Sequence, residues 1–122
     1  MGTMPGHPFI NFVLEYTRGM STGINTMAKA EEVVRYAAQI IRQHVPDPSY
    51  RIFLFGSRAE GNFRINSDID IGIEGPAPLP RETITDIAEE LEDAPTLYSI
   101  DVVDFARVPA KFRAVASKRI TL

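Results

Sequence analysis

The chain has 122 residues, of which 44% are hydrophobic and 24% charged, with a formal net charge of −3 and no cysteine. This length and balance fit one globular domain and exclude disordered, collagen-like and low-complexity classes. The lack of cysteine excludes disulfides and zinc–thiolate sites, and the net negative charge argues against binding duplex DNA by charge alone. No segment approaches the roughly 18 apolar residues of a membrane span, so we expect a cytoplasmic protein without a membrane partner.

The first 26 residues differ in composition from the rest of the chain. They contain four of the eight glycines and only two charged residues, Glu15 and Arg18. One interpretation is a loosely ordered extension. The other is a short helix through the apolar segment Phe9–Tyr16 that docks on the domain or on a partner. We therefore predict an N-terminal extension at 1–26 and one domain at 27–122.

From residue 27 onward, segments with helical periodicity alternate with segments of strand type. Apolar residues recur every three or four positions before Pro46, which is typical of an amphipathic helix. Strict alternation of isoleucine with polar residues or glycine is typical of a strand that is buried on one face. After that first helix we predict strands at Tyr50–Phe55 and Asp68–Glu74, a helix at Pro80–Asp93, a strand at Tyr98–Phe105 and a short helix after Pro109. This order predicts an α+β fold, an α/β sandwich around a small sheet.

A turn with the features of a phosphate site follows the first predicted strand. The strand ends at Gly56, where a glycine allows a sharp turn and the close approach of a ligand. Ser57 then opens what we expect to be a single helical turn, closed by Gly61. Free backbone N–H groups at such a turn attract phosphate, and the Ser57 hydroxyl adds a donor.

Two aspartates of the next strand form a carboxylate pair. Asp68 and Asp70 are two residues apart, so both side chains lie on one face of the strand. Carboxylates crowded together repel each other, and a divalent cation relieves that repulsion. Mg²⁺ prefers such hard oxygen ligands together with substrate phosphates. The pair and the preceding turn therefore indicate a Mg²⁺–nucleotide site.

The last predicted strand offers two candidates for a third carboxylate, Asp101 and Asp104. Their spacing of three puts them on opposite faces of the strand, so only one of them can readily join the pair. Ile100 and Val102 face the core if Asp101 faces the site. We therefore favour Asp101.

The ordered pattern G-S-x3-G-x5-S-D-x-D, from Gly56 to Asp70, with a later aspartate flanked by apolar residues, resembles the nucleotidyltransferase superfamily of DNA polymerase β. More narrowly, the chain is similar to the minimal nucleotidyltransferases of the antitoxin type, which are little more than a catalytic core. The resemblance covers about residues 27–122 and implies a small mixed sheet with helices packed on it.

The resemblance also implies roles for individual residues. Gly56 and Ser57 match the family's phosphate-binding turn. Asp68 and Asp70 match its catalytic metal carboxylates, and Asp101 matches its third carboxylate. Two Mg²⁺ ions would assist transfer of a nucleoside monophosphate, expected to be AMP from ATP, to a hydroxyl group with release of pyrophosphate.

Two further residues of the motif are candidates for nucleotide binding, Arg58 and Ser67. Arg58, like Arg64, is either a cation that meets phosphate charge or a solvated loop residue.

The chain lacks a second surface to hold an acceptor, which favours a separately encoded partner. By resemblance, that partner is a helical protein of the HEPN type, a toxin in many such pairs, whose hydroxyl receives AMP. The alternatives are a non-catalytic subunit that masks such a partner and a stand-alone enzyme that modifies a small molecule. The three clustered carboxylates favour retained catalysis.

Overall fold

The computed structural model describes residues 27, 29–61, 67–116 and 118–122. The predicted extension at 1–26 and Arg64 lie outside the described residues. In chain order the elements are α2 (Ala30–His44), β1 (Arg51–Phe55), α3 (Ser57–Glu60), β2 (Ile69–Glu74), α4 (Arg81–Glu92), β3 (Ile100–Asp104), α5 (Ala110–Val115) and β4 (Ile120–Thr121). The predicted helices and strands are confirmed, with ends shifted by up to three residues. The strand β4 was not predicted.

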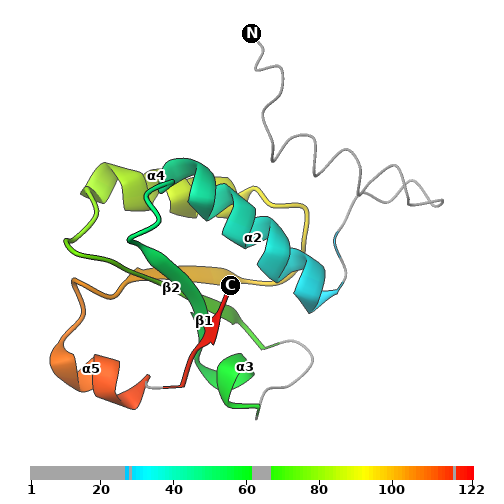
Figure 1. The fold of residues 1–122 in the computed structure, drawn as a ribbon. Helices are drawn as coiled ribbons and strands as arrows, with labels where there is room; N and C mark the ends of the chain where they lie inside the picture. The colour runs from blue at the N-terminus through cyan, green and yellow to red at the C-terminus, as the bar shows by residue number, and fades with distance from the viewer. Residues whose placement is uncertain (1–26, 28, 62–66, 117) are drawn as a thin grey trace, which may run out of the picture.

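The four strands form one mixed sheet in the order β3-β2-β1-β4. The strand β2 pairs antiparallel with β1 and parallel with β3, and β4 pairs antiparallel with β1. Figure 1 shows α2 and α4 together over one face of this sheet and α5 on its other side. The predicted α+β sandwich is therefore confirmed.

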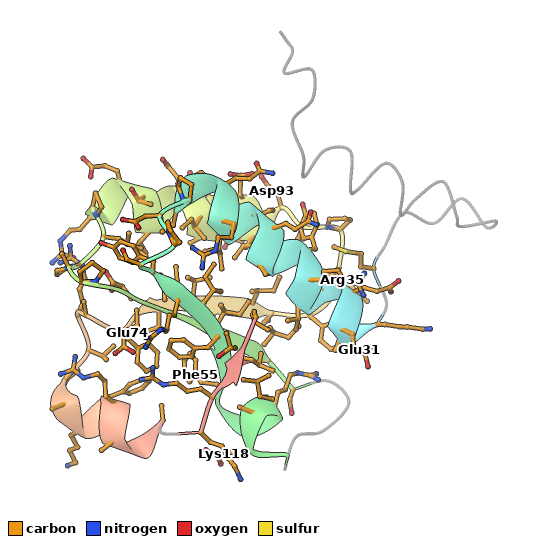
Figure 2. All side chains as sticks on the ribbon, in the orientation of Figure 1. Glu31, Arg35, Phe55, Glu74, Asp93 and Lys118 are labelled. Carbon is orange, nitrogen blue, oxygen red and sulfur yellow. The ribbon has the colours of Figure 1, made fainter. Side chains whose placement is uncertain are left out.

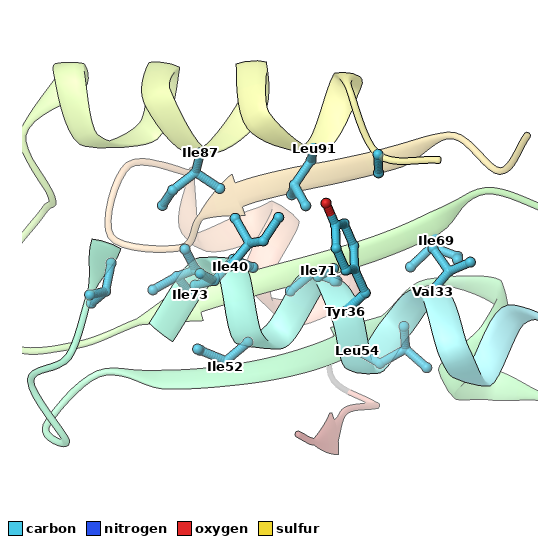
Figure 3. Packing of buried hydrophobic residues seen from close by; sticks show 14 of the residues in the cluster. Val33, Tyr36, Ile40, Ile52, Leu54, Ile69, Ile71, Ile73, Ile87 and Leu91 are labelled. Carbon is cyan, nitrogen blue, oxygen red and sulfur yellow. The ribbon is translucent and has the colours of Figure 1, made fainter. Parts of the chain in front are cut away.

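The face of the sheet under α2 and α4 carries the main hydrophobic core. Ile69, Ile71 and Ile73 of β2 are fully buried there, as the alternation in the sequence predicted. They pack with Ile40 of α2 and Ile87 of α4, which are also fully buried (Figure 3). Because β2 alternates strictly, its polar residues are directed to the opposite face.

The opposite face holds a smaller aromatic cluster next to the polar residues of β2. Phe53 and Phe105 meet edge to face with ring centroids 4.8 Å apart, and Phe55 stands 5.0 Å from Phe105. Gly72 lies between them, because a Cβ there would come within 2.4 Å of the Phe53 ring and 2.7 Å of the Phe105 ring. Figure 2 shows Phe55 on this side of the sheet, away from α2.

Among the described residues, no helix is long and apolar enough to cross a lipid bilayer.

Candidate functional site

The turn after β1 has the geometry that its glycine allows. Gly56 adopts φ 77° and ψ −157°, a backbone conformation that is unfavourable for residues with a side chain. Its carbonyl accepts hydrogen bonds from the N–H groups of Ala59 and Glu60, both at 3.1 Å, which begins α3. Gly61 is left-handed, at φ 83°, and closes the turn by donating to the Ser57 carbonyl at 3.0 Å. The single helical turn predicted after Gly56 is therefore present.

The carboxylate of Asp70 lies directly against this turn. In the sheet, Asp70 is paired with Phe55 of β1 on one side and with Asp101 of β3 on the other. A Cβ on Gly56 would come within 2.4 Å of Asp70 Oδ2. The missing side chain at position 56 thus provides the space that the Asp70 carboxylate occupies.

Asp70 and Asp101 lie side by side on this face of the sheet, and Asp68 comes directly before β2. Partial burial raises the pKa of Asp70, and the negative charges of Asp101 and Asp68 raise the same pKa further. Asp68 and Asp101 are exposed to solvent, whereas Asp70 is half-buried. The repulsion between Asp70 and its acidic neighbours is one that a cation would relieve.

Asp104, the other candidate of β3, makes contacts that hold the fold together. Its carboxylate is buried and accepts hydrogen bonds from the N–H of Leu79 at 2.9 Å and of Ala106 at 3.0 Å. Arg107 Nε lies 3.4 Å from Asp104 Oδ2. Asp104 shares the phase of Ile100 and Val102, which pack against the core. It is Asp101, not Asp104, that lies beside Asp70.

The sequence left two interpretations of Arg58, a cation that meets phosphate charge or a solvated loop residue. The structure contradicts the second. Arg58 is only 9% exposed, and its Nε and Nη2 donate to the Ser67 carbonyl at 3.2 and 2.9 Å. Its guanidinium carbon also lies 5.2 Å from the ring centroid of Tyr98. Tyr98 was predicted only as part of a strand, and nothing in its local sequence signals this contact. The sequence also predicted a contact between Arg58 and a nucleotide, and these contacts within the protein do not test it.

A cavity of about 450 Å³ opens beside Asp101 at the edge of the sheet. Tyr98, Ser99 and Asp101 line it from the segment around the start of β3, and Leu91 and Glu92 line it from α4. The strand β3 is the outermost strand on this side of the sheet. The cavity therefore lies between α4 and the edge of the sheet, next to the strand that carries Asp101.

Residues 25–121 match the family described as Polymerase beta, Nucleotidyltransferase. The chain belongs to this family of nucleotidyltransferases. The site geometry agrees with the membership, since the motif aspartates and the glycine turn lie together.

Among curated proteins, the chain is 30% identical over 90 residues to the probable protein adenylyltransferase MntA of Haemophilus influenzae. The match covers 74% of this chain and 76% of that relative. The nucleotidyltransferase is therefore of the minimal type and is related to MntA.

Solved structures share the fold of this nucleotidyltransferase. A chain of a toxin–antitoxin crystal structure with AMP-PNP is 24% identical, with a TM-score of 0.52, and the match covers 75% of this chain and 71% of that one. A chain from the complex of a tri-AMPylated Shewanella oneidensis HEPN toxin with its MNT antitoxin is 20% identical, with a TM-score of 0.51. That second match covers 75% of this chain and 69% of the other.

Members of the polymerase β nucleotidyltransferase family typically use a divalent metal, and the donor set of this chain fits one. Within the described ranges, no three Asp, Glu or His side chains are gathered tightly enough to form a finished metal centre. Asp68, Asp70 and Asp101 nevertheless interact electrostatically, and they offer the hard oxygen ligands that Mg²⁺ prefers. A bound cation would remove the repulsion that the negative charges of Asp101 and Asp68 exert on Asp70.

Proposed function

We propose that residues 27–122 form a catalytic domain that transfers AMP from ATP to a hydroxyl group of a partner protein, while residues 1–26 are an extension outside it. The observation that carries this proposal is the position of the Asp70 carboxylate, between the Gly56 turn and the carboxylates of Asp101 and Asp68. In this proposal the turn binds phosphate and the carboxylates bind a cation, and nucleotidyl transfer needs both.

The turn after β1 holds the triphosphate in this proposal. The Ser57 hydroxyl and the backbone N–H groups at the start of α3 donate hydrogen bonds to phosphate oxygens. Ser67, which is half-buried directly before Asp68 in the chain, adds a further contact to the nucleotide in this proposal. These donors orient the α-phosphate, and orientation contributes much of the rate in phosphoryl-type transfer.

Asp68, Asp70 and Asp101 would hold Mg²⁺, with two ions in the active complex. When bound, Mg²⁺ neutralises phosphate charge and lowers the pKa of the acceptor hydroxyl. The acceptor oxygen forms a bond to the α-phosphorus, the bond from that phosphorus to the bridging oxygen breaks, and pyrophosphate leaves. The hydroxyl proton passes to solvent. Asp101 also borders the cavity at the edge of β3, and in this proposal the acceptor approaches from that edge.

The acceptor in this proposal belongs to a helical protein of the HEPN type. The support is the relation to MntA and the shared fold with chains from toxin–antitoxin complexes, one of which contains an AMPylated HEPN toxin. The chain would then act as the antitoxin of such a pair.

The test is a labelling experiment on the native protein with its co-purifying proteins. The complex is incubated with α-labelled ATP and Mg²⁺, and the label is located by gel electrophoresis and mass spectrometry. Asp70→Asn is the variant, and Asp86→Asn on the exposed face of α4 is the matched control. We expect label on a hydroxyl side chain of a co-purifying protein with the wild type and the control, and none with Asp70→Asn.

Other outcomes would replace the proposal. Label on a small molecule, with no protein partner recovered, would indicate a stand-alone nucleotidyltransferase. A stable partner complex that takes up no label would indicate a non-catalytic masking subunit.

A further inference from the structure

Arg58 is a buried cation between the parts of the chain that carry the carboxylates. Its side chain starts in α3, immediately after Ser57, and only 9% of the residue is exposed. Two of its nitrogens donate to one acceptor, the carbonyl of Ser67, at 3.2 and 2.9 Å. Ser67 is the residue before Asp68, so this contact holds the chain at the point where the aspartate pair begins.

The same guanidinium reaches the segment that leads into β3. Its carbon lies 5.2 Å from the Tyr98 ring centroid, within the usual range for a cation on an aromatic face. Next to this contact, the N–H of Ile69 donates to the carbonyl of Ser99 at 2.9 Å. Arg58 therefore contacts both segments immediately before the strands that carry Asp70 and Asp101.

We propose that Arg58 is a positioning residue that fixes the segment of Asp68 relative to the segment of Asp101, and that it does not bind the nucleotide phosphates. This inference rests on the proposed function for its kinetic consequences. Its effect on the geometry of the carboxylates holds whether or not the acceptor is a protein.

The contacts favour positioning over phosphate binding because they use the shape of the guanidinium. A planar group can donate from two nitrogens to one carbonyl and present its face to a ring at the same time, which an ammonium group cannot do. A phosphate ligand needs charge above all, and lysine supplies that charge well. Substitution by lysine therefore separates the two roles.

The experiment compares Arg58→Lys and Arg58→Gln in the full-length protein, with Arg35→Lys at an exposed position of α2 as the matched control. The first readout is Mn²⁺ binding to the protein without nucleotide, measured by electron paramagnetic resonance. The second is the dependence of transfer on Mg²⁺ concentration and on ATP concentration. Thermal unfolding reports whether each variant is folded.

We expect both Arg58 variants to weaken Mn²⁺ binding by about tenfold and to raise the half-maximal Mg²⁺ concentration for transfer to a similar extent. The KM for ATP at saturating Mg²⁺ should stay within about threefold of the wild type, and the control should match the wild type. A large rise in KM for ATP with Arg58→Gln, mostly rescued by Arg58→Lys, would overturn the proposal and make Arg58 a phosphate ligand. Unchanged Mn²⁺ binding in both variants would also overturn it.

Tyr98 gives a second test that does not depend on the folding of the Arg58 variants. Tyr98→Leu should weaken Mn²⁺ binding, whereas Tyr98→Phe, which keeps the ring, should not. Equal effects of the two variants would contradict the role of the ring face. A wild-type protein without transfer activity would refute the proposed function. It would not refute this inference, because Mn²⁺ binding needs no acceptor and can still be compared among the variants.

Discussion

The two faces of β2 show how one short strand serves stability on one side and chemistry on the other. On the face under α2 and α4, Ile69, Ile71 and Ile73 are fully buried. On the other face, Asp70 stands beside Asp101 with its pKa raised by burial and by neighbouring charges. The packing of the isoleucines on the first face stabilises the native state. The crowded carboxylates on the second face destabilise it, and a bound cation would remove that repulsion. Substitutions on the two faces should therefore separate stability from activity.

The largest expected change in stability comes from the core face. Ile71→Ala removes a fully buried side chain between β2 and the helices, and such truncations destabilise proteins by about 2–5 kcal/mol. Chemical denaturation should measure that loss in the free energy of unfolding. Ile120→Ala in β4, where the side chain is 47% exposed, is the control and should change stability by less than about 0.5 kcal/mol. Similar losses in the two variants would contradict the assignment of the core.

A second comparison uses the two aspartates of β3. Asp101→Asn should reduce transfer by about 10²–10³-fold, a size typical of removing one electrostatic contact to the transition state, and leave the unfolding free energy nearly unchanged. Asp104→Asn should instead lower stability by about 1–3 kcal/mol, because an amide cannot replace a carboxylate that accepts from two backbone N–H groups and faces Arg107. Transfer rates and denaturation curves of both variants check this. The reverse result would mean that the third carboxylate is Asp104.

The sequence predicted the core face of the sheet because alternation is a local signal. Every isoleucine of β2 lies where the period of two placed it, and the same argument put Asp101 rather than Asp104 beside Asp70. The strand β4 was missed because its two residues carry no pattern. Its place depends on pairing with Phe53 and Leu54, far away in the chain.

The environment of Arg58 could not be predicted for a similar reason. Its guanidinium contacts the carbonyl of Ser67 and the ring of Tyr98, which are 9 and 40 residues away. A backbone carbonyl has no sequence signature, and an aromatic residue before a strand is common. Gly72 lies on the face where the alternation of β2 predicts it, but only the tertiary structure shows that its lack of a side chain lets the Phe53 and Phe105 rings meet.

A smaller effect should distinguish the two glycines with positive φ in the turn. Gly56→Ala should cost about 1–3 kcal/mol of stability through backbone strain, and its Cβ would also displace the Asp70 carboxylate. Gly61→Ala, at φ 83°, should cost about 1–2 kcal/mol without touching the site, because a Cβ there meets no atom within 4 Å among the described residues other than its chain neighbours. Mn²⁺ binding should therefore weaken in Gly56→Ala only. Equal loss of binding in both variants would mean that the turn acts through its backbone alone.

The smallest expected effect is a pH dependence of stability that comes from Asp70. In the folded, metal-free protein its pKa is raised above the ordinary value of 3.8, so the native state holds this proton more tightly than the unfolded state. The free energy of unfolding should therefore fall as the pH rises from the ordinary value through the raised one, and the loss should be complete above it. Asp70→Asn removes this contribution to the pH dependence.

The measurement is the difference in unfolding free energy between wild type and Asp70→Asn in EDTA, across a series of pH values from about 4 to 7. Taking the difference cancels Asp47, whose pKa is lowered by hydrogen bonds from Ser49 and whose own contribution has the opposite slope. The variant should gain relative stability as the pH rises. A difference that does not vary with pH would show that neither burial nor the charges of Asp101 and Asp68 raise the pKa of Asp70. Saturating Mg²⁺ should then stabilise the wild type more than the variant, because a ligand that binds only the native state adds its binding free energy to the stability.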